Sequence, residues 1–137
     1  MATRFAMVAL LLALTGCGNG LYPVRGTVTY DDGSPVSQGM VVFENADGTT
    51  MARGQIQSDG SYQLSTQSPN DGLKPGRYKV LVNPLDMSDV PDEQKKLPFD
   101  VKFTRFQTSG IEVDVKAETN QVPIRVTRPA KAGGRPK

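Results

Sequence analysis

The stretch Val24–Tyr30 reads VRGTVTY, and the next five residues, Asp31–Pro35, read DDGSP. In the first stretch Val24, Gly26, Val28 and Tyr30 fall on one side of an extended chain, and the polar residues between them fall on the other. A period of two is that of a β-strand with one buried face. Asp, Gly and Pro in the second stretch favour a tight turn. Together they predict a strand that ends in a turn.

The same alternation recurs along the next hundred residues, broken each time by turn residues such as Asp47-Gly48, Asp59-Gly60 and Pro75-Gly76. The predicted strands cover 22–30, 38–46, 50–57, 61–65, 77–83, 111–116 and 122–126. Many short strands between turn signals predict an all-β sandwich or barrel. The residues expected to point inward include Val41, Phe43, Ala52, Ile56, Tyr62, Leu64, Tyr78, Val80, Val82, Ile111, Val113 and Val115. Asn120 is predicted to turn the chain, and Pro123 indicates an edge position for the last strand, because proline cannot donate to a sheet.

Residues 84–108 break the pattern with three prolines and a charged run, so they have room for one or two helical turns. Phe99, Phe103 and Phe106 are too apolar for a solvated loop. We expect them to pack over a sheet edge or over one end of the core.

The N-terminus has the features of an export signal. Arg4 precedes the uncharged apolar run 5–14, and small residues follow it. A membrane-spanning helix is the alternative, but ten residues extend only ~15 Å along a helix, against a hydrocarbon core of ~30 Å. We therefore expect residues 1–16 to be removed as a signal peptide.

Leu14-Thr15-Gly16-Cys17 resembles the lipobox of bacterial lipoproteins, which is an aliphatic residue and two small residues before a cysteine. The resemblance implies cleavage between Gly16 and Cys17 and attachment of acyl chains, such as palmitate, to Cys17. A leftover cysteine in an ordinary signal peptide is the alternative, but Cys17 is the only cysteine in the chain and lies where cleavage is expected. Two or three acyl chains would hold the protein durably, because each buried CH₂ contributes about 0.8 kcal/mol.

The segments on either side of the β domain are short. Residues 17–21 form the lipidated N-terminus and a spacer, and the chain from Cys17 to Val24 reaches at most roughly 25 Å, so the domain must lie near the membrane. Gly18 follows the cysteine in place of the aspartate that retains enterobacterial lipoproteins in the inner membrane, which favours the outer membrane. Residues 128–137 carry four positive charges and no large apolar residue, so we expect a disordered basic tail. Such a tail serves solubility or contacts an anionic membrane surface.

Composition excludes several classes of function. The net charge is +2, which gives no general attraction to nucleic acid. The chain has no histidine, which excludes nucleophiles activated by imidazole. Asp31 with Asp32 could in principle supply paired carboxylates, and the Asp-Gly pairs could suggest calcium. Both occur where hairpins must turn, so we predict plain turns, no metal, no cofactor and no enzymatic activity.

Several of these pieces occur in a fixed order: VRGTVTY at 24–30, DGSPV at 32–36, VVF at 41–43, DGSY at 59–62, PGRYKV at 75–80 and TSGIEV at 108–113. This order resembles the small lipoproteins of planctomycete-type bacteria that carry a carboxypeptidase-regulatory-like, or transthyretin-like, domain. The resemblance covers residues 22–127 and implies a seven-stranded antiparallel β-sandwich of prealbumin-like topology. Transthyretin-related hydrolases of this fold use histidines, which are absent here.

The functional expectation is a lipid-anchored, non-catalytic module of the cell envelope with a structural or protein-interaction role. Its partners would be the membrane, through the lipid on Cys17, and other envelope proteins. The alternative is a module that binds carbohydrate or peptide in an envelope assembly. Tyr30, Tyr62 and Tyr78 are predicted to point into the core, which leaves few aromatic platforms for sugar stacking; the pattern leaves the orientation of Tyr22 open.

Overall fold

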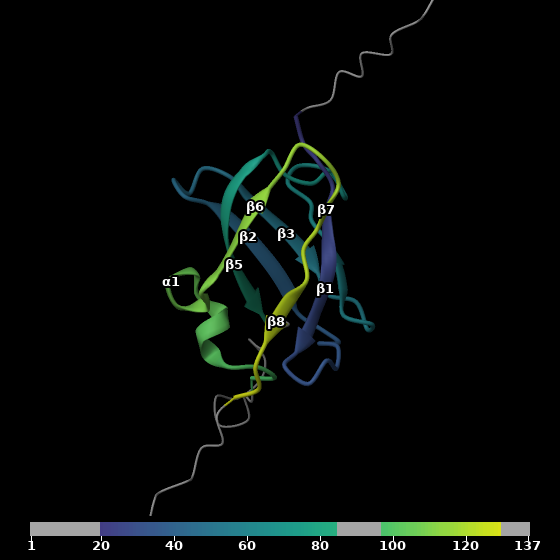
Figure 1. Cartoon of the computed structure of the whole chain (residues 1–137), viewed down its shortest axis with the longest axis vertical. Coiled ribbons are helices and arrows are strands. Elements are labelled where there is room, and N and C mark those ends of the chain that lie inside the picture. Colours follow the sequence, from purple (N-terminus) through teal and green to yellow (C-terminus); the bar gives the residue numbers. More distant parts are fainter. Residues whose placement is uncertain (1–19, 85–96, 130–137) are drawn as a thin grey trace, which may run out of the picture.

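The computed structural model describes residues 20–84 and 97–129. They form a mostly β fold of two sheets, with two short helical turns (Figure 1). The strands are β1 Val24–Tyr30, β2 Met40–Asn45, β3 Met51–Gln55, β4 Ser61–Gln63, β5 Gly76–Asn83, β6 Ile111–Val115, β7 Asn120–Gln121 and β8 Ile124–Val126. The helical turns are η2 Val101–Thr104 and α1 Phe106–Ser109.

One sheet has the order β4-β1-β7, with β8 also paired to β1, and the other has the order β3-β2-β5-β6. The sequence predicts an antiparallel arrangement, and this is wrong for two strand pairs: β1 runs parallel to β7 and to β8. The predicted last strand, 122–126, forms only as β8, and β7 lies before it at Asn120–Gln121. The two strands are separate because Pro123 has no N–H with which to continue the ladder to β1. The predicted edge position of the last strand is confirmed, since β7 and β8 lie at one end of their sheet.

The core lies between the two sheets and is built from the side chains that the alternation places inward. Phe43 lies at its centre, with the ring centroids of Tyr62 and Tyr78 both 6.4 Å away. The fully buried side chains include Val24, Val28, Val41, Phe43, Leu64, Leu73, Val80, Val82, Phe99, Ile124 and Val126. Tyr30, Ile111 and Val113 are only partly buried against this core. The predicted inward faces of the strands are thus confirmed.

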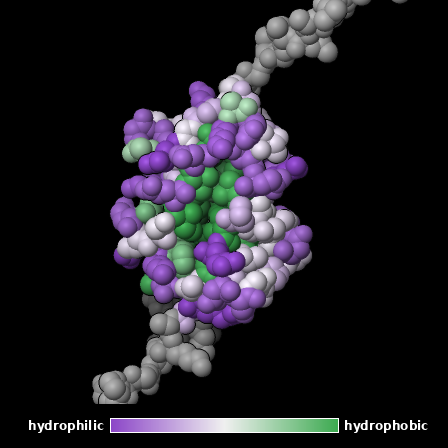
Figure 2. All heavy atoms as spheres, viewed as in Figure 1, coloured by the Kyte–Doolittle hydropathy of each residue, from purple (hydrophilic) through white to green (hydrophobic). Residues whose placement is uncertain are grey.

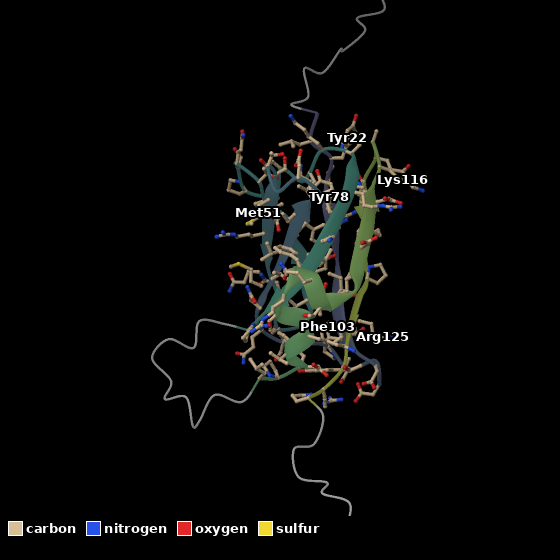
Figure 3. The ribbon with its side chains drawn as sticks, turned by 90° about the vertical axis from the view of Figure 1, so that its left-hand side faces the viewer. Tyr22, Met51, Tyr78, Phe103, Lys116 and Arg125 are labelled. Carbon is tan, nitrogen blue, oxygen red and sulfur yellow. The ribbon has the colours of Figure 1, made fainter. Side chains whose placement is uncertain are left out.

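The segment 97–110, which includes η2 and α1, closes one end of the core. Phe99 is fully buried and Phe103 is nearly so, whereas Phe106 is half-buried. Ser109 Oγ donates to the carbonyl of Val80 at 2.5 Å, and the N–H of Asp100 donates to the carbonyl of Thr127 at 2.8 Å. The segment therefore joins both sheets, and Figure 3 shows it lying over the lower part of β5. This confirms the expectation for Phe99 and Phe103.

Three turns share the triplet Asp-Gly-Ser/Thr, at 32–34, 47–49 and 59–61. In each turn the aspartate accepts hydrogen bonds from the N–H and the hydroxyl of the residue two positions later, at 2.5–3.2 Å. The middle residue is a glycine with φ between 72° and 88°, which other residues rarely adopt. The predicted turns are confirmed at these places. Asn120 instead begins β7, and its side chain closes the preceding turn by bonding to Lys116 and Glu118.

The two ends of the described chain leave from opposite ends of the long axis of the molecule (Figure 1). Tyr22 and Leu73 exchange two backbone hydrogen bonds of 2.8 and 3.0 Å, so the folded body begins at Tyr22. At the other end Arg128, the first residue of the predicted tail, is held in place: its guanidinium lies 2.7 Å from Asp32 Oδ2 and 4.1 Å from the centroid of Tyr30. Within the described residues no helix is long and apolar enough to cross a membrane.

Candidate functional site

A groove of about 860 Å³ lies on the outer face of the sheet that contains β1, beside the corner where β3 approaches β4. Its residues come mainly from β1, β3, β4 and the segment around β7. They are Arg25, Gly26, Thr27, Arg53, Gly54, Gln55, Gln57, Ser61, Tyr62, Gln63, Ser65, Asn70, Gln121 and Pro123.

Strand register brings the groove side chains to one face. Arg25 is directly opposite Gln63 on β4, and Ser65, two residues further on, is directly opposite Arg53. Paired residues in a sheet point to the same side, as do residues two apart along a strand. Arg25 and Arg53 therefore share the outer face, with Cα atoms about 12 Å apart if two strand spacings and two residue rises are combined. Gln121 is opposite Arg25 on the other side of β1 and extends the row.

The inner side of the groove floor depends on two glycines. A Cβ at Gly26 would lie 2.0 Å from the carbonyl oxygen of Val122, and one at Gly54 would lie 2.6 Å from that of Gln63. Tyr62, opposite Gly26 in the register, uses this space, because its hydroxyl donates to the Val122 carbonyl at 2.6 Å. Burial raises the pKa of the Tyr62 phenol, so this donor keeps its proton. The floor is therefore fixed by a buried bond across β1.

Charge is distributed unequally among the strands. Strands β1, β3, β4, β7 and β8 contain three arginines and no acidic residue. In contrast, β2, β5 and β6 carry both signs, and Arg77 pairs with Asp114 across β5 and β6 at 3.2 Å. Neither Arg25 nor Arg53 forms an ion pair with another described residue, and both are exposed. The groove thus presents two guanidinium groups with no described carboxylate lining it.

A guanidinium group offers a fork of N–H donors that matches carboxylate, sulfate or phosphate oxygens. The glutamine, asparagine, serine and threonine side chains around the two arginines donate and accept hydrogen bonds with hydroxyl groups. Tyr62 is 3% exposed, so its ring is not a stacking surface for a ligand. The groove can therefore recognise polar and anionic groups.

A second, smaller groove of about 400 Å³ lies between β6 and β7, where the two sheets are not hydrogen-bonded to each other. Figure 2 shows a strip of apolar residues in the middle of this side of the molecule. Val113 and Val122 contribute to its lining, and Glu112, Asp114 and Glu118 lie along its rim. It differs from the larger groove in having three acidic residues, Glu112, Asp114 and Glu118, in its lining.

The residues that the sequence singles out lie elsewhere. Gly16 and Cys17, the predicted cleavage and lipidation site, are outside the described residues, as are residues 85–96 and the tail from 130. Asp32 lies in the turn after β1, where the Ser34 hydroxyl, the Ser34 N–H and Arg128 lower its pKa to about 2. In the other two triplet turns the hydroxyl of Thr49 lowers the pKa of Asp47, and the hydroxyl of Ser61 lowers the pKa of Asp59. In each turn the backbone N–H of the same residue makes the next largest contribution.

The carboxylate of Asp71 also accepts hydrogen bonds from backbone N–H groups of its loop. Burial alone would raise its pKa, but the N–H groups of Thr66, Ser68 and Gln67 donate to the carboxylate, and the net pKa is lowered. Among residues 20–84 and 97–129, no three acidic, histidine or cysteine side chains gather as metal ligands. The Asp-Gly segments in this part of the chain therefore stabilise turns.

Sequence patterns alone do not predict the groove. The alternation places Arg25 on the outward face of its strand, but Arg53 and Gln121 are far away along the chain. One usable signal is the absence of acidic residues from the stretches 24–30, 51–55, 61–63 and 120–126. That signal becomes informative only when these stretches are known to be neighbours.

Comparison with known proteins adds a fold likeness and no identity. No protein-family model matches the chain, and no curated protein matches it. Among solved structures, it is similar to the crystal structure of a DUF3823 family protein from Parabacteroides merdae, with 15% sequence identity and a TM-score of 0.48. The match covers 78% of this chain and 46% of the other, so this chain spans about half the length of that protein.

Proposed function

We propose that this chain is a lipid-anchored, non-catalytic binding module of the bacterial cell envelope. The observation that carries the proposal is Leu14-Thr15-Gly16-Cys17, directly after a short apolar run and with the only cysteine of the chain at its end. Acylation of Cys17 and cleavage after Gly16 would tether the β domain to the membrane. In this proposal the domain has the carboxypeptidase-regulatory-like, transthyretin-like character that the order of its motifs suggests.

The position of the folded body agrees with a short tether. Because ordered backbone bonding starts at Tyr22, only residues 18–21 separate the anchor from the fold. Five residue steps from Cys17 to Tyr22 reach at most about 17 Å. The opposite end of the long axis, with Arg128 and the turn after β1, would then face away from the membrane (Figure 1).

A binding role is favoured over catalysis by the chemistry of the larger groove. The chain has no histidine, and the described residues that line this groove include no carboxylate and no cysteine. Catalytic bases work best with a pKa near the operating pH. Asp32, which belongs to the candidate carboxylate pair Asp31 and Asp32, has a pKa of about 2. Arginine and amide side chains bind and orient a ligand without supplying a base.

The anchor is tested by expressing the full chain in a bacterial host with labelled palmitate. The expected mature protein begins at Cys17, carries the label and sediments with membranes. Cys17→Ala should carry no label and keep residues 1–16, whereas Thr15→Ser, which keeps a small residue, should be processed normally. A mature wild-type protein whose Cys17 thiol is unmodified by mass spectrometry would contradict the proposal.

A substitution at Gly18 tests separately whether the protein is sorted to the inner or to the outer membrane. In an enterobacterial host the wild-type chain should fractionate with the outer membrane. Gly18→Asp should move it to the inner membrane while the palmitate label is retained. If the wild-type protein and Gly18→Asp distribute in the same way between the inner and outer membranes, the result would contradict outer-membrane sorting but not lipidation.

A further inference from the structure

We infer that the groove formed by β1, β3 and β4 binds an extended acidic polysaccharide, with Arg25 and Arg53 holding negative groups on the sugar chain. This inference rests on the proposed binding function and names the class of ligand. It depends on the charge, the hydrogen-bonding groups and the backbone pairing of the groove.

The charge of the groove is the first argument. Arg25 and Arg53 are exposed and make no ion pair with a described residue, although the chain as a whole is nearly balanced. Across β2, β5 and β6, in contrast, the cation Arg77 is opposite Asp114, and Lys79 is opposite both Glu44 and Glu112. Positive charge is thus matched by acidic residues across β2, β5 and β6, and it has no described acidic partner at Arg25 and Arg53. An anionic ligand supplies the missing partner for both arginines.

The separation of the two arginines is the second argument. Their Cα atoms lie about 12 Å apart across the sheet, as the strand spacings indicate. Two cationic groups on separate strands suit a ligand that carries more than one negative group. A chain with repeated negative groups can contact both, and its affinity gains from the second contact.

The remaining lining favours a sugar over a peptide. Gln55, Gln63, Asn70 and Gln121 carry amides, which donate to and accept from hydroxyl groups. A bound peptide commonly adds a strand to a free sheet edge and fills apolar pockets. Here β4 is paired with β1 on one side, and Arg53 and Ser65 exchange backbone hydrogen bonds of 3.0 and 2.8 Å on the other. The groove therefore presents polar side chains in place of a free edge.

The test measures binding of the full chain, purified in detergent micelles, to four polymers by affinity electrophoresis and calorimetry. Polygalacturonate carries carboxylates, dextran sulfate carries sulfates, dextran is neutral, and poly-glutamate is an acidic peptide. Both acidic polysaccharides should bind more tightly than dextran and poly-glutamate, and added salt should weaken the binding of both acidic polysaccharides. The stronger of the two identifies which negative group the groove prefers.

Arg25→Gln and Arg53→Gln should each weaken binding roughly fivefold, the factor for one solvent-exposed charge contact. Arg105→Gln is the matched control, because it removes the same charge from an exposed residue between η2 and α1 and should leave binding unchanged. A similar loss in Arg105→Gln would mean general charge attraction and would overturn the inference. Equal or tighter binding of poly-glutamate would overturn it in favour of a peptide.

Failure of the inference and failure of the proposed function give different results. If dextran binds as tightly as the acidic polymers and the arginine substitutions have no effect, the ligand class is wrong but a binding module remains. If no polymer binds, both the inference and the binding role fail. Palmitate labelling of Cys17 tests the anchor independently in either case.

Discussion

Replacing Tyr62 by phenylalanine removes one hydroxyl and leaves the ring in the core. The hydroxyl passes over Gly26 and donates to the Val122 carbonyl at 2.6 Å, and this bond is buried. Among described residues Val122 O has no other hydrogen-bond donor. The substitution therefore leaves a buried carbonyl unsatisfied, at the place where Pro123 already interrupts the ladder between β1 and the last strands.

The expected cost follows from that geometry. A buried polar group without a partner costs about 1–3 kcal/mol, so Tyr62→Phe should lower the free energy of unfolding by about 2 kcal/mol. For a domain of this size each 1 kcal/mol lowers Tm by roughly 5 °C, which gives a decrease of roughly 10 °C. Urea denaturation followed by circular dichroism measures the free energy, and a thermal scan measures Tm.

Tyr78→Phe is the matched control. Its ring also packs against Phe43, and its hydroxyl donates to the Lys74 carbonyl at 2.8 Å, but this bond is only partly buried. Water can replace the lost donor there, so the cost should be below about 1 kcal/mol. Equal stability of Tyr62→Phe and wild type, or a larger loss in Tyr78→Phe, would refute the reasoning about the Val122 carbonyl.

Three further substitutions test other parts of the structure. Gly26→Ala would place a methyl group 2.0 Å from the Val122 carbonyl oxygen, so the variant should unfold at a much lower urea concentration than Tyr62→Phe; a wild-type midpoint would contradict the close approach of these strands. The pKa of Asp32 is lowered to about 2 in the folded state, so its carboxylate stabilises the fold above its unfolded pKa, and this contribution is lost as pH falls from about 4 to about 2. Asp32→Asn should therefore lose less stability than wild type between pH 7 and pH 2, and equal losses would contradict the assignment. Arg128→Ala removes an exposed ion pair and a contact with the Tyr30 ring, so the urea midpoint should fall slightly, whereas an unchanged midpoint would show that this end of β8 is not held by Arg128.

Local sequence was sufficient for the strands, their faces and their turns. Phe43, Tyr62 and Tyr78 follow the alternation into the core, and the Asp-Gly triplets stand at the turns after β1, β2 and β3. The two phenylalanines Phe99 and Phe103 were predictable because an apolar ring in a loop must find cover. Each of these features depends on residues close together in the chain.

The relative direction of the strands, and which strands lie next to each other, were not predictable from local sequence. A period of two is the same for parallel and antiparallel strands, so nothing in residues 120–126 shows that β7 and β8 run parallel to β1. The requirement for glycine at position 26 is likewise invisible, because the atom that a Cβ would strike belongs to Val122, almost a hundred residues away. Long-range contacts of this kind depend on which strands become neighbours.

The sequence by itself determined an all-β chain with buried and exposed strand faces, and it carries the Leu14–Cys17 signal on which the proposed anchor depends. Only the tertiary structure decided that Arg25, Arg53 and Gln121 share one groove, and that acidic and basic residues stand opposite each other across β5 and β6. The physical reason is that alternation fixes the side of a strand on which a residue lies, whereas packing of the whole chain fixes which strands meet.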